Sequence, residues 1–460
     1  MSGQNLEQLL QSRGNPVEML RNSQIGPYAF PVVRSEFTNW RDEQRAWRET
    51  CVLFDQSHHM TDLYITGPDA IRLLSDLGIN SFEGFRVNQA KQFVACNHEG
   101  HVIGDAILFY LAENTLSLVG RPPAINWVQY HAETGGYQVK TERDERSAMN
   151  RKGRKFYRYQ IQGPNALKVM QEAIGGKIPD IRFFTMAPVT IAGQEVRALR
   201  HGMVGQPGWE LFGPWENGDA VRNAIVSAGN SYGIRQVGAR AYPTSCLESG
   251  WIPSPLPAIY VGEKLKRYRQ WLTDQSYEAT ASLGGSFHAA DIKDYYLTPY
   301  DLGYGPFAKF DHSFIGRDAL EIVSKGPSRR KVTLVWNGDD VTRALGTLFQ
   351  RTGAFAKYID LPLANYATLP FDKVLSGGKH VGLSTYTGYT VNERALVSLA
   401  VLEAAHAQPG TEVTVVWGED GGASSKPTVE RHAQVEIRAT VAPAPISEVA
   451  RHSYRPHAVA

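Results

Sequence analysis

Apolar residues recur with two different spacings along residues 1–325. Short runs typical of β-strands, such as 60–65 and 157–162, alternate with segments that have the pattern of amphipathic helices, such as 68–77 and 124–134. Strands and helices that alternate in this way are typical of a mixed architecture. The pattern therefore predicts an α+β fold for this part of the chain.

A strand, a Gly-Pro pair and a helix follow one another twice in this region. The pair is Gly67-Pro68 the first time and Gly163-Pro164 the second time. Proline is favoured at the first position of a helix, so Pro164 is expected there. This short internal repeat predicts two related α+β units. A further helix, rich in aromatic residues, is expected at 36–48.

The pattern changes near residue 326, after which strand-like runs predominate. Glycine-rich turns separate the expected strands, which are 331–336, 380–385, 396–402, 412–417 and 434–441. Several short strands at such spacing are typical of a compact barrel or a small sandwich. We therefore expect two interleaved α+β subdomains over residues 1–325, a β-barrel over 326–446 and a poorly ordered tail over 447–460.

Length and composition are those of a folded multidomain protein. At 460 residues the chain exceeds what one hydrophobic core usually serves. Hydrophobic residues make up 42% and charged residues 20%, and the formal net charge is only +2. A nucleic-acid-binding surface would require a larger basic excess, so we expect no nucleic-acid partner. The basic stretch 150–155 is interpreted as a solvated loop.

Three cysteines, Cys51, Cys96 and Cys246, lie far apart in the sequence. Their spacing argues against a disulfide framework and against a structural zinc site. Residues 1–22 are polar and lack the apolar centre of a signal peptide, and no apolar run reaches 18 residues. We therefore expect no membrane partner and a location in the reducing cytoplasm.

Four motifs, in the same order along nearly the whole chain, resemble the aminomethyltransferase family, which includes the T-protein of the glycine cleavage system. They are 101–105 (HVIGD), 208–211 (GWEL), 237–250 (VGARAYPTSCLESG) and 311–320 (DHSFIGRDAL). The resemblance implies an aminomethyltransferase-like, folate-binding fold with a C-terminal β-barrel domain. Where the T-protein has two adjacent aspartates, this chain has Gly104-Asp105, which argues against aminomethyl chemistry.

A narrower resemblance is to the tetrahydrofolate-dependent aromatic O-demethylases of lignin catabolism, which act on vanillate, 3-O-methylgallate and syringate. It is carried by 18–26, 53–60, 240–243 and 248–257. The resemblance implies transfer of a methyl group from a methoxylated aromatic acid to N5 of tetrahydrofolate. Two alternatives remain: an aminomethyl or dimethylglycine-type folate transferase, and a non-catalytic folate-binding regulatory protein.

Within this resemblance Tyr242 and His59 are the candidate catalytic residues. The leaving group of an aryl methyl ether is a phenolate, whose conjugate acid has a pKa of about 10, so an acid of similar pKa facilitates its departure. Tyr242 is such an acid, although a tyrosine before Pro243 can also serve only packing. His59 would orient the ring hydroxyl beside the methoxy group, unless the His58-His59 pair is structural. Adjacent strand residues point to opposite faces, so we expect no metal site there.

Three residues are candidates for binding the aromatic acid. Arg121 ends an expected strand at 115–120, and its guanidinium can bind a carboxylate through two parallel hydrogen bonds. The alternative is an ordinary surface arginine. Tyr28 and Phe30 lie on the proline-flanked loop 26–31, and the resemblance places a tyrosine of the vanillate enzyme's pocket at the position of Phe30.

Five residues are candidates for binding the folate. Glu210 can accept two N–H bonds from the aminopyrimidine edge of a pterin. The resemblance adds Gln162 through its amide and Phe183 and Trp251 through ring contacts, with core packing as the alternative for both rings. Asp105 either contacts the folate or stabilises a turn.

Overall fold

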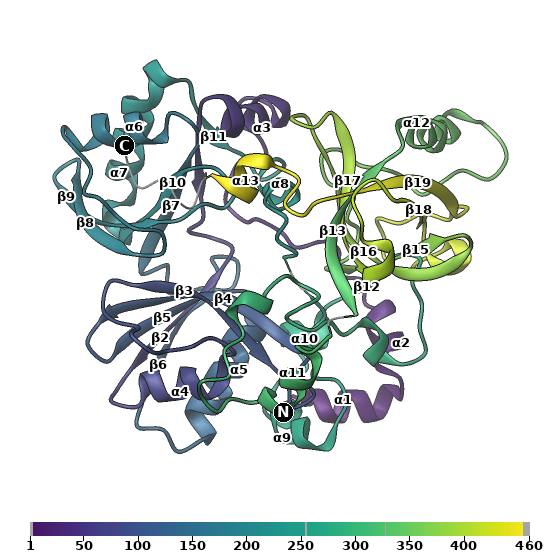
Figure 1. Cartoon of the computed structure of the whole chain (residues 1–460), viewed down its shortest axis with the longest axis horizontal. Helices are drawn as coiled ribbons and strands as arrows, with labels where there is room; N and C mark the ends of the chain where they lie inside the picture. Colours follow the sequence, from purple (N-terminus) through teal and green to yellow (C-terminus); the bar gives the residue numbers. More distant parts are fainter. Residues whose placement is uncertain (1–2, 254, 327, 454–460) are drawn as a thin grey trace.

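Two β-sheets and one closed barrel organise the computed structural model, which describes residues 3–253, 255–326 and 328–453 (Figure 1). The two sheets lie one above the other on the left of Figure 1, and the barrel lies on the right. An α+β fold with a C-terminal barrel was expected from the sequence, and the structure confirms it. The division of the chain at residue 325 stays a prediction.

The first sheet has six strands in the order β11-β1-β7-β10-β9-β8, of which only the β1–β11 pair is parallel. Its strands are β1 (Cys51–Asp55), β7 (Phe156–Gln162), β8 (Met186–Ile191), β9 (Gln194–Arg200), β10 (Gly208–Pro214) and β11 (Ile234–Val237). Its helices are α3 (Trp40–Glu49), α6 (Ala166–Ile174) and α7 (Gly218–Gly229).

The second sheet has five antiparallel strands in the order β3-β4-β5-β2-β6. Its strands are β2 (Thr61–Thr66), β3 (Ala90–Cys96), β4 (Val102–Ala112), β5 (Thr115–Gly120) and β6 (Lys140–Asp144), and its helices are α4 (Ala70–Leu77) and α5 (Pro122–Thr134). The chain thus enters the first sheet with β1, builds the second sheet, and returns to the first with β7.

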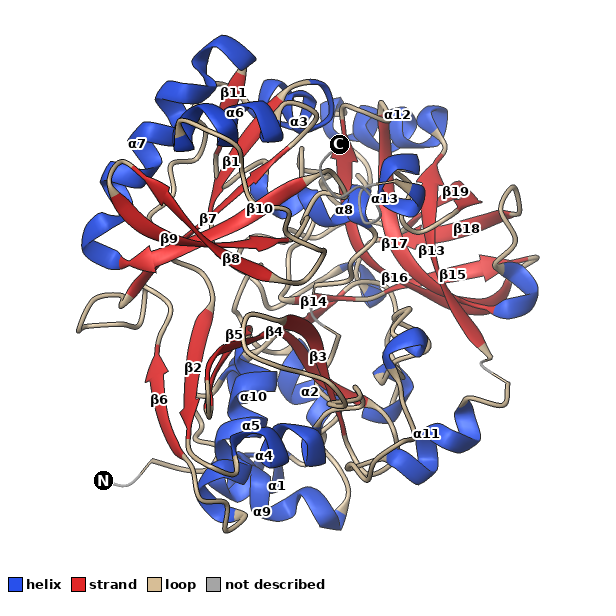
Figure 2. Ribbon diagram, turned by 60° about the vertical axis from the view of Figure 1, so that its left-hand side comes forward, coloured by secondary structure: helices blue, strands red, loops and turns tan. Residues whose placement is uncertain are grey.

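The two sheets face each other, and their helices cover the outer sides. Figures 1 and 2 both show α6 and α7 beyond the six-stranded sheet and α4 and α5 beyond the five-stranded sheet. Between the sheets, Phe109 of β4 packs against Phe212 of β10, with ring centroids 5.4 Å apart. Side chains at this junction therefore come from both sheets.

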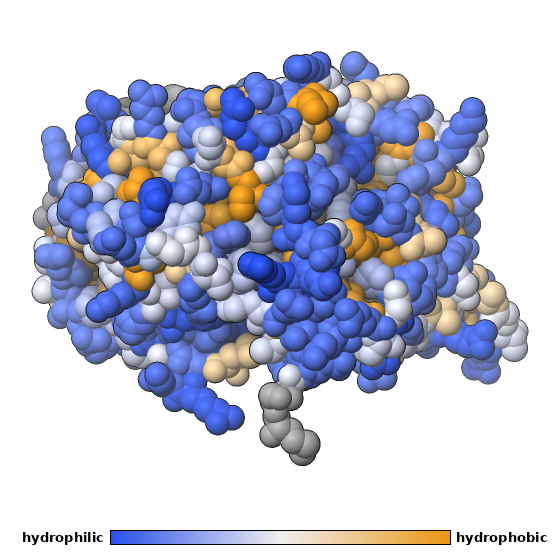
Figure 3. Space-filling view, turned by 90° about the horizontal axis from the view of Figure 1, so that it is seen from below, coloured by the Kyte–Doolittle hydropathy of each residue, from blue (hydrophilic) through white to orange (hydrophobic). Residues whose placement is uncertain are grey.

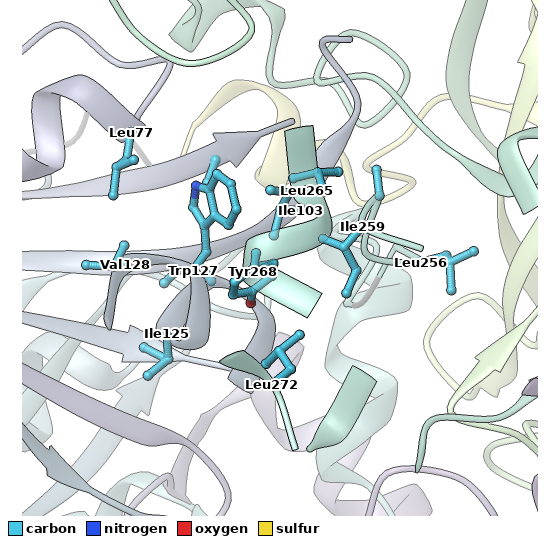
Figure 4. Packing of buried hydrophobic residues seen from close by; sticks show 14 of the residues in the cluster. Leu77, Ile103, Ile125, Trp127, Val128, Leu256, Ile259, Leu265, Tyr268 and Leu272 are labelled. Atoms are coloured by element: carbon cyan, nitrogen blue, oxygen red, sulfur yellow. The ribbon is translucent and has the colours of Figure 1, made fainter. Parts of the chain in front are cut away.

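Short helices and a small two-stranded sheet complete the region before the barrel. They are α1 (Leu6–Arg13), α2 (Pro16–Arg21), α8 (Ser245–Ser249), α9 (Lys266–Trp271), α10 (Tyr277–Thr280), α11 (Arg317–Val323), β12 (Leu283–Gly284) and β14 (Leu369–Pro370). Asn5 caps α1 and Asn15 caps α2 through side-chain oxygens. Trp127 of α5 packs edge-on against Tyr268 of α9 in the largest core cluster (Figure 4).

The barrel closes in the order β13-β17-β16-β15-β18-β19, so it is a barrel and not a sandwich. Its strands are β13 (Arg329–Trp336), β15 (Asp372–Ser376), β16 (Lys379–Thr390), β17 (Ala395–Glu403), β18 (Glu412–Trp417) and β19 (Val435–Ala442), and α12 (Gly338–Gly346) follows β13. The five expected strands correspond to five of these. Leu399 and Val401 of β17 pack in one cluster with residues of β3, which joins the barrel to the five-stranded sheet.

Three local expectations are corrected. Helix α6 begins at Ala166, so Pro164 precedes the helix and is not its first residue. Helix α3 begins at Trp40, because the side chain of Asn39 caps it by accepting from the amide of Asp42. In place of a tail, Glu448–His452 forms helix α13, which buries Ala450; residues 454–460 lie outside the described residues.

The exterior has the character of a water-exposed surface on the face that Figure 3 shows. That face is mainly hydrophilic, with hydrophobic residues in small groups. Over the described ranges, no helix combines the length and the apolar character that a membrane span needs.

Candidate active site

A cavity of about 330 Å³ lies where the two sheets, the segment after β11 and strand β13 of the barrel meet. Its wall combines apolar and aromatic side chains with a small set of polar groups, which is typical of a small-molecule site. Eight of the ten residues selected from the sequence line it: Phe30, His59, Asp105, Arg121, Phe183, Glu210, Tyr242 and Trp251. The structure therefore brings together most of the expected site.

Tyr242 begins a single 3-10 turn (Tyr242–Thr244) that follows strand β11, and its amide donates to the carbonyl of Gly238 at 2.9 Å. The ring is only 4% exposed. It packs edge-on against Phe54 of β1, with centroids 5.1 Å apart. A short turn fixed against a buried strand holds the phenol in place at the cavity wall.

The hydroxyl of Tyr242 lies 3.6 Å from Sδ of Met203, within reach for a weak hydrogen bond to sulfur. Burial raises the pKa of Tyr242 well above its usual range, and a hydrogen bond with the Gln56 side chain acts in the opposite direction. Tyr242 is therefore protonated at neutral pH. It is also a weaker acid than the free phenol that the sequence argument assumed.

His59 faces Tyr242 across the cavity. The two ring centroids are 4.9 Å apart, and the ring of Phe30 lies 4.7 Å from His59 and 4.6 Å from Tyr242. Among the described residues, Nδ1 of His59 is buried without a hydrogen-bond partner. Burial, followed by the charge of Arg121, lowers the pKa of His59 to about 3. His59 is thus a neutral imidazole with a ring nitrogen available to a ligand.

His58 points elsewhere. Its Nδ1 lies 2.8 Å from Oγ of Ser147, its Nε2 lies 3.4 Å from Asp55, and its ring packs against Trp215. These contacts make His58 a structural residue. The expectation that His59 is the histidine of the pair with access to the site agrees with this arrangement.

Arg121 lies between β5 and α5, directly before Pro122 and Pro123 in the first turn of the helix. Its guanidinium carbon lies 4.2 Å from the centroid of the Tyr28 ring. Tyr28 in turn donates its hydroxyl proton to the carbonyl of His59. Tyr28 does not line the main cavity. It lines an adjoining cavity of about 20 Å³ with Phe30 and Arg121, so its contact is with the arginine.

Glu210 lies on β10 and faces the cavity from the six-stranded sheet. Arg158 donates to its Oε1, while its Oε2 lies 3.7 Å from Nδ1 of His201. The buried guanidinium of Arg158 is also held by Asp62 at 3.0 Å. Because a carboxylate oxygen has more than one acceptor site, Glu210 can bind Arg158 and a ligand together.

Asp105 lies within strand β4 and not in a turn, so the turn-stabilising alternative is wrong. Its Oδ2 accepts from Gln92 at 2.6 Å, from Tyr304 at 3.0 Å and from the indole of Trp251 at 3.1 Å. Burial raises the pKa of Asp105, and the hydrogen bonds from Tyr304 and Trp251 act in the opposite direction. Asp105 and Trp251 therefore form one polar unit of the wall.

Gly104, which precedes Asp105 in the motif, leaves no room for a side chain. A Cβ at Gly104 would lie 2.9 Å from the backbone nitrogen of Ala124 in α5, closer than side-chain atoms normally approach. Glycine thus allows β4 to lie directly against the first turn of α5. This close approach brings Asp105 and Arg121 to the same cavity.

Gln162 does not line the cavity. Its side-chain oxygen accepts from the amide of Val204 at 2.8 Å. Among the described residues its side-chain nitrogen is buried without a hydrogen-bond partner, and its contact with folate stays a prediction. Phe183 does line the cavity, next to Phe184 at 4.8 Å between centroids.

Several lining residues were not selected from the sequence. They include Gln56, Gln92, His201, Met203, Tyr304, Lys331 and Tyr386. Gln92 and Tyr304 bind Asp105 from separate segments, and Lys331 and Tyr386 come from the barrel. No local motif marks them, because only the fold brings these segments together. Within the described part of the chain, no group of three His, Cys, Asp or Glu side chains is arranged to hold a metal ion.

Fold and site together define a class of protein. The GCVT N-terminal domain model matches residues 18–254, and the chain belongs to this family of glycine cleavage T-protein relatives. Within it, the chain is 51% identical to syringate O-demethylase of Sphingobium sp. (strain NBRC 103272 / SYK-6), over 98% of this chain and 97% of that protein.

Two further comparisons extend this result. Sesamin methylene transferase of Sinomonas sp. (strain No.22) is 30% identical, over 92% of both chains. The crystal structure of the glycine cleavage system aminomethyltransferase T from Bartonella henselae aligns with a TM-score of 0.59 at 18% identity, over 92% of both chains. At this identity the structural likeness shows the fold alone.

Proposed function

We propose that this protein is a tetrahydrofolate-dependent O-demethylase that removes the methyl group of a methoxylated aromatic acid such as syringate, vanillate or 3-O-methylgallate. The observation that carries the proposal is the meeting of Tyr242, His59 and Arg121 in one cavity with Glu210 and Asp105. A proton donor, a neutral imidazole and a guanidinium are the groups that a methoxylated phenolic acid requires. Extensive identity to a syringate O-demethylase supports the same activity.

The residues of the cavity fit a folate. A pterin presents adjacent N–H donors, and Glu210 provides a buried carboxylate that lines the cavity. Phe183 and Trp251 supply aromatic surface. Tetrahydrofolate, when bound, supplies N5 as the methyl acceptor and the N–H proton that replaces the one given up by Tyr242.

Tyr242 is proposed to donate its hydroxyl proton to the ether oxygen as the bond between that oxygen and the methyl carbon breaks. Protonation yields a neutral phenol instead of a buried phenolate. Burial raises the pKa of Tyr242, but a phenolate formed in the same cavity experiences the same loss of solvation. Donor and leaving group therefore remain matched, although both are weaker acids than in water.

His59 and Arg121 are proposed to orient the aromatic acid. The neutral imidazole of His59 can exchange a hydrogen bond with a ring hydroxyl next to the methoxy group. Arg121 can bind the carboxylate with two parallel N–H bonds while its other face rests on Tyr28. Binding at both ends fixes which ring oxygen lies at Tyr242.

We further propose a small aromatic acid, and neither a nucleic acid nor a membrane, as the partner, and the cytoplasm as the location. All three cysteines, Cys51, Cys96 and Cys246, are buried as free thiols, which suits a reducing compartment. A role in catabolism of lignin-derived aromatics would follow from such substrates.

Incubation of the purified protein with tetrahydrofolate and each methoxy acid, followed by chromatography of folates and aromatics, tests the proposal. We expect methyl-tetrahydrofolate and the demethylated phenol in equal amounts, without consumption of oxygen or NADH. Turnover of glycine-derived or dimethylglycine substrates instead would establish the aminomethyl-type alternative. Folate binding with no turnover of any of these compounds would establish the non-catalytic alternative.

A further inference from the structure

Of the described residues that line the cavity, two are lysine or arginine, namely Arg121 and Lys331. The proposed function uses Arg121 for the carboxylate of the aromatic acid. Lys331 has no role in that reaction, and it comes from strand β13 of the barrel, not from either sheet.

Lys331 and Arg121 both line the cavity together with Asp105. Both cations stabilise the charged form of Asp105. A Cβ at Gly303 would lie 3.2 Å from Nζ of Lys331, so the ammonium lies over the backbone next to Tyr304. Lys331 is therefore on the Tyr304 side of the cavity.

Aromatic side chains line the cavity near Asp105 and this cation. Tyr304 donates to Asp105 and accepts from the indole of Trp251 at 2.9 Å, and its ring stacks with Phe307 at 6.0 Å between centroids. All three rings line the cavity. An aromatic wall that ends at a lysine suits a ligand whose aryl group is followed by a carboxylate.

We propose that Lys331 binds the glutamate carboxylates of tetrahydrofolate, and that the barrel thereby contributes directly to the affinity for this molecule. The inference rests on the proposed function. Folate joins a pterin, an aminobenzoyl ring and a glutamate in line. The cavity offers matching chemistry for each of the three parts. Glu210 suits the pterin, and Lys331 suits the glutamate. The aminobenzoyl ring is matched by the aromatic wall, which consists of Trp251, Tyr304 and Phe307.

A titration that compares two ligands tests this role by binding alone. Tetrahydrofolate carries the glutamate, whereas 6-methyltetrahydropterin has the same head group and lacks the tail. Quenching of tryptophan fluorescence gives the Kd of each ligand for the wild-type chain and for Lys331→Gln. We expect Lys331→Gln to weaken tetrahydrofolate roughly 5- to 20-fold, as for loss of one charge-assisted contact, and to leave the pterin unchanged.

Arg330→Gln is the matched control, because Arg330 precedes Lys331 on the same strand, is exposed and does not line the cavity. It should change neither Kd. Lys331→Arg keeps the charge and should retain tetrahydrofolate affinity, which separates loss of the cation from loss of the fold. Higher salt should weaken wild-type binding of tetrahydrofolate more than binding of the pterin.

Two results would overturn the inference. If the wild-type chain binds tetrahydrofolate and Lys331→Gln binds it equally well, or loses both ligands in the same proportion, Lys331 does not bind the tail. That result would leave the proposed demethylation intact. A wild-type chain that binds no tetrahydrofolate would overturn the proposed function and this inference together.

Discussion

The rings of His59 and Tyr242 lie 4.9 Å apart and at 72° to each other, and Phe30 contacts both. Two polar side chains with different tasks thus face one small aromatic surface. In the proposed reaction, a ring that carries a hydroxyl next to a methoxy group would present its two oxygens to this pair. The pair combines a neutral histidine with a protonated tyrosine.

The low pKa of His59 predicts how acid affects the protein. Burial lowers this pKa to about 3, so the folded chain does not protonate His59 near pH 5, whereas the unfolded chain protonates it below about pH 6.5. Between these values the unfolded state binds more protons, and stability falls as the pH falls. Urea unfolding of wild type and His59→Asn at pH 7 and pH 5 measures this contribution.

Wild type should lose more free energy of unfolding between pH 7 and pH 5 than His59→Asn does. Equal losses would mean that His59 is protonated at pH 5 in the folded protein as it is in the unfolded chain, so that folding does not lower its pKa. The same pKa predicts that His59 causes no inflection between pH 5 and pH 8 in the pH profile of kcat/KM.

Arg121→Lys should weaken binding of the aromatic acid. A lysine retains the charge but lacks the planar pair of donors, so KM for the methoxy acid should rise about 10- to 100-fold, with a smaller change in kcat. The KM of the matching methyl ester should change much less. Arg146→Lys is the control, since Arg146 also lies over Tyr28, at 5.5 Å, without lining the cavity. An equal effect of both variants would argue against a carboxylate contact at Arg121.

Glu210→Gln should weaken binding of the pterin head group. The amide offers one acceptor oxygen in place of two and leaves Arg158 with one fewer carboxylate, so the Kd of 6-methyltetrahydropterin should rise about 10- to 100-fold and Tm should fall. Glu216→Gln, at an exposed position soon after β10, should change neither value. Unchanged pterin affinity in Glu210→Gln would exclude a contact between this carboxylate and the head group.

Local pattern predicted much of the fold. The spacing of apolar residues predicted most strands and helices of the two sheets. Strand-like runs separated by glycine-rich turns predicted the barrel. The prediction of a poorly ordered tail was wrong for Glu448–His452, which form a helix. Burial of Ala450 stabilises this helix, and the polar, charged sequence does not reveal that burial. The predicted start of helix α3 was wrong because the side-chain cap at Asn39 determines where the helix begins.

The site was predictable where a motif places a residue, and not where distant segments meet. Glu210 and Asp105 follow glycines in short motifs, and both line the cavity. Arg158 is part of an ordinary strand, and its buried pairing with Glu210 depends on the register of β7 with β10. Lys331 reaches the cavity because the barrel lies against the sheets. Gln162 does not line the cavity, and its contact with folate stays a prediction.

The role of Tyr242 as proton donor is tested most directly by the rate of methyl transfer in a single turnover of Tyr242→Phe. Phenylalanine keeps the ring contacts with Phe30 and Phe54 and removes only the hydroxyl. We expect a rate about 10²- to 10⁴-fold below wild type, with Kd values for tetrahydrofolate and the methoxy acid within about twofold of wild type. A variant that transfers the methyl group at the wild-type rate would contradict this role of Tyr242.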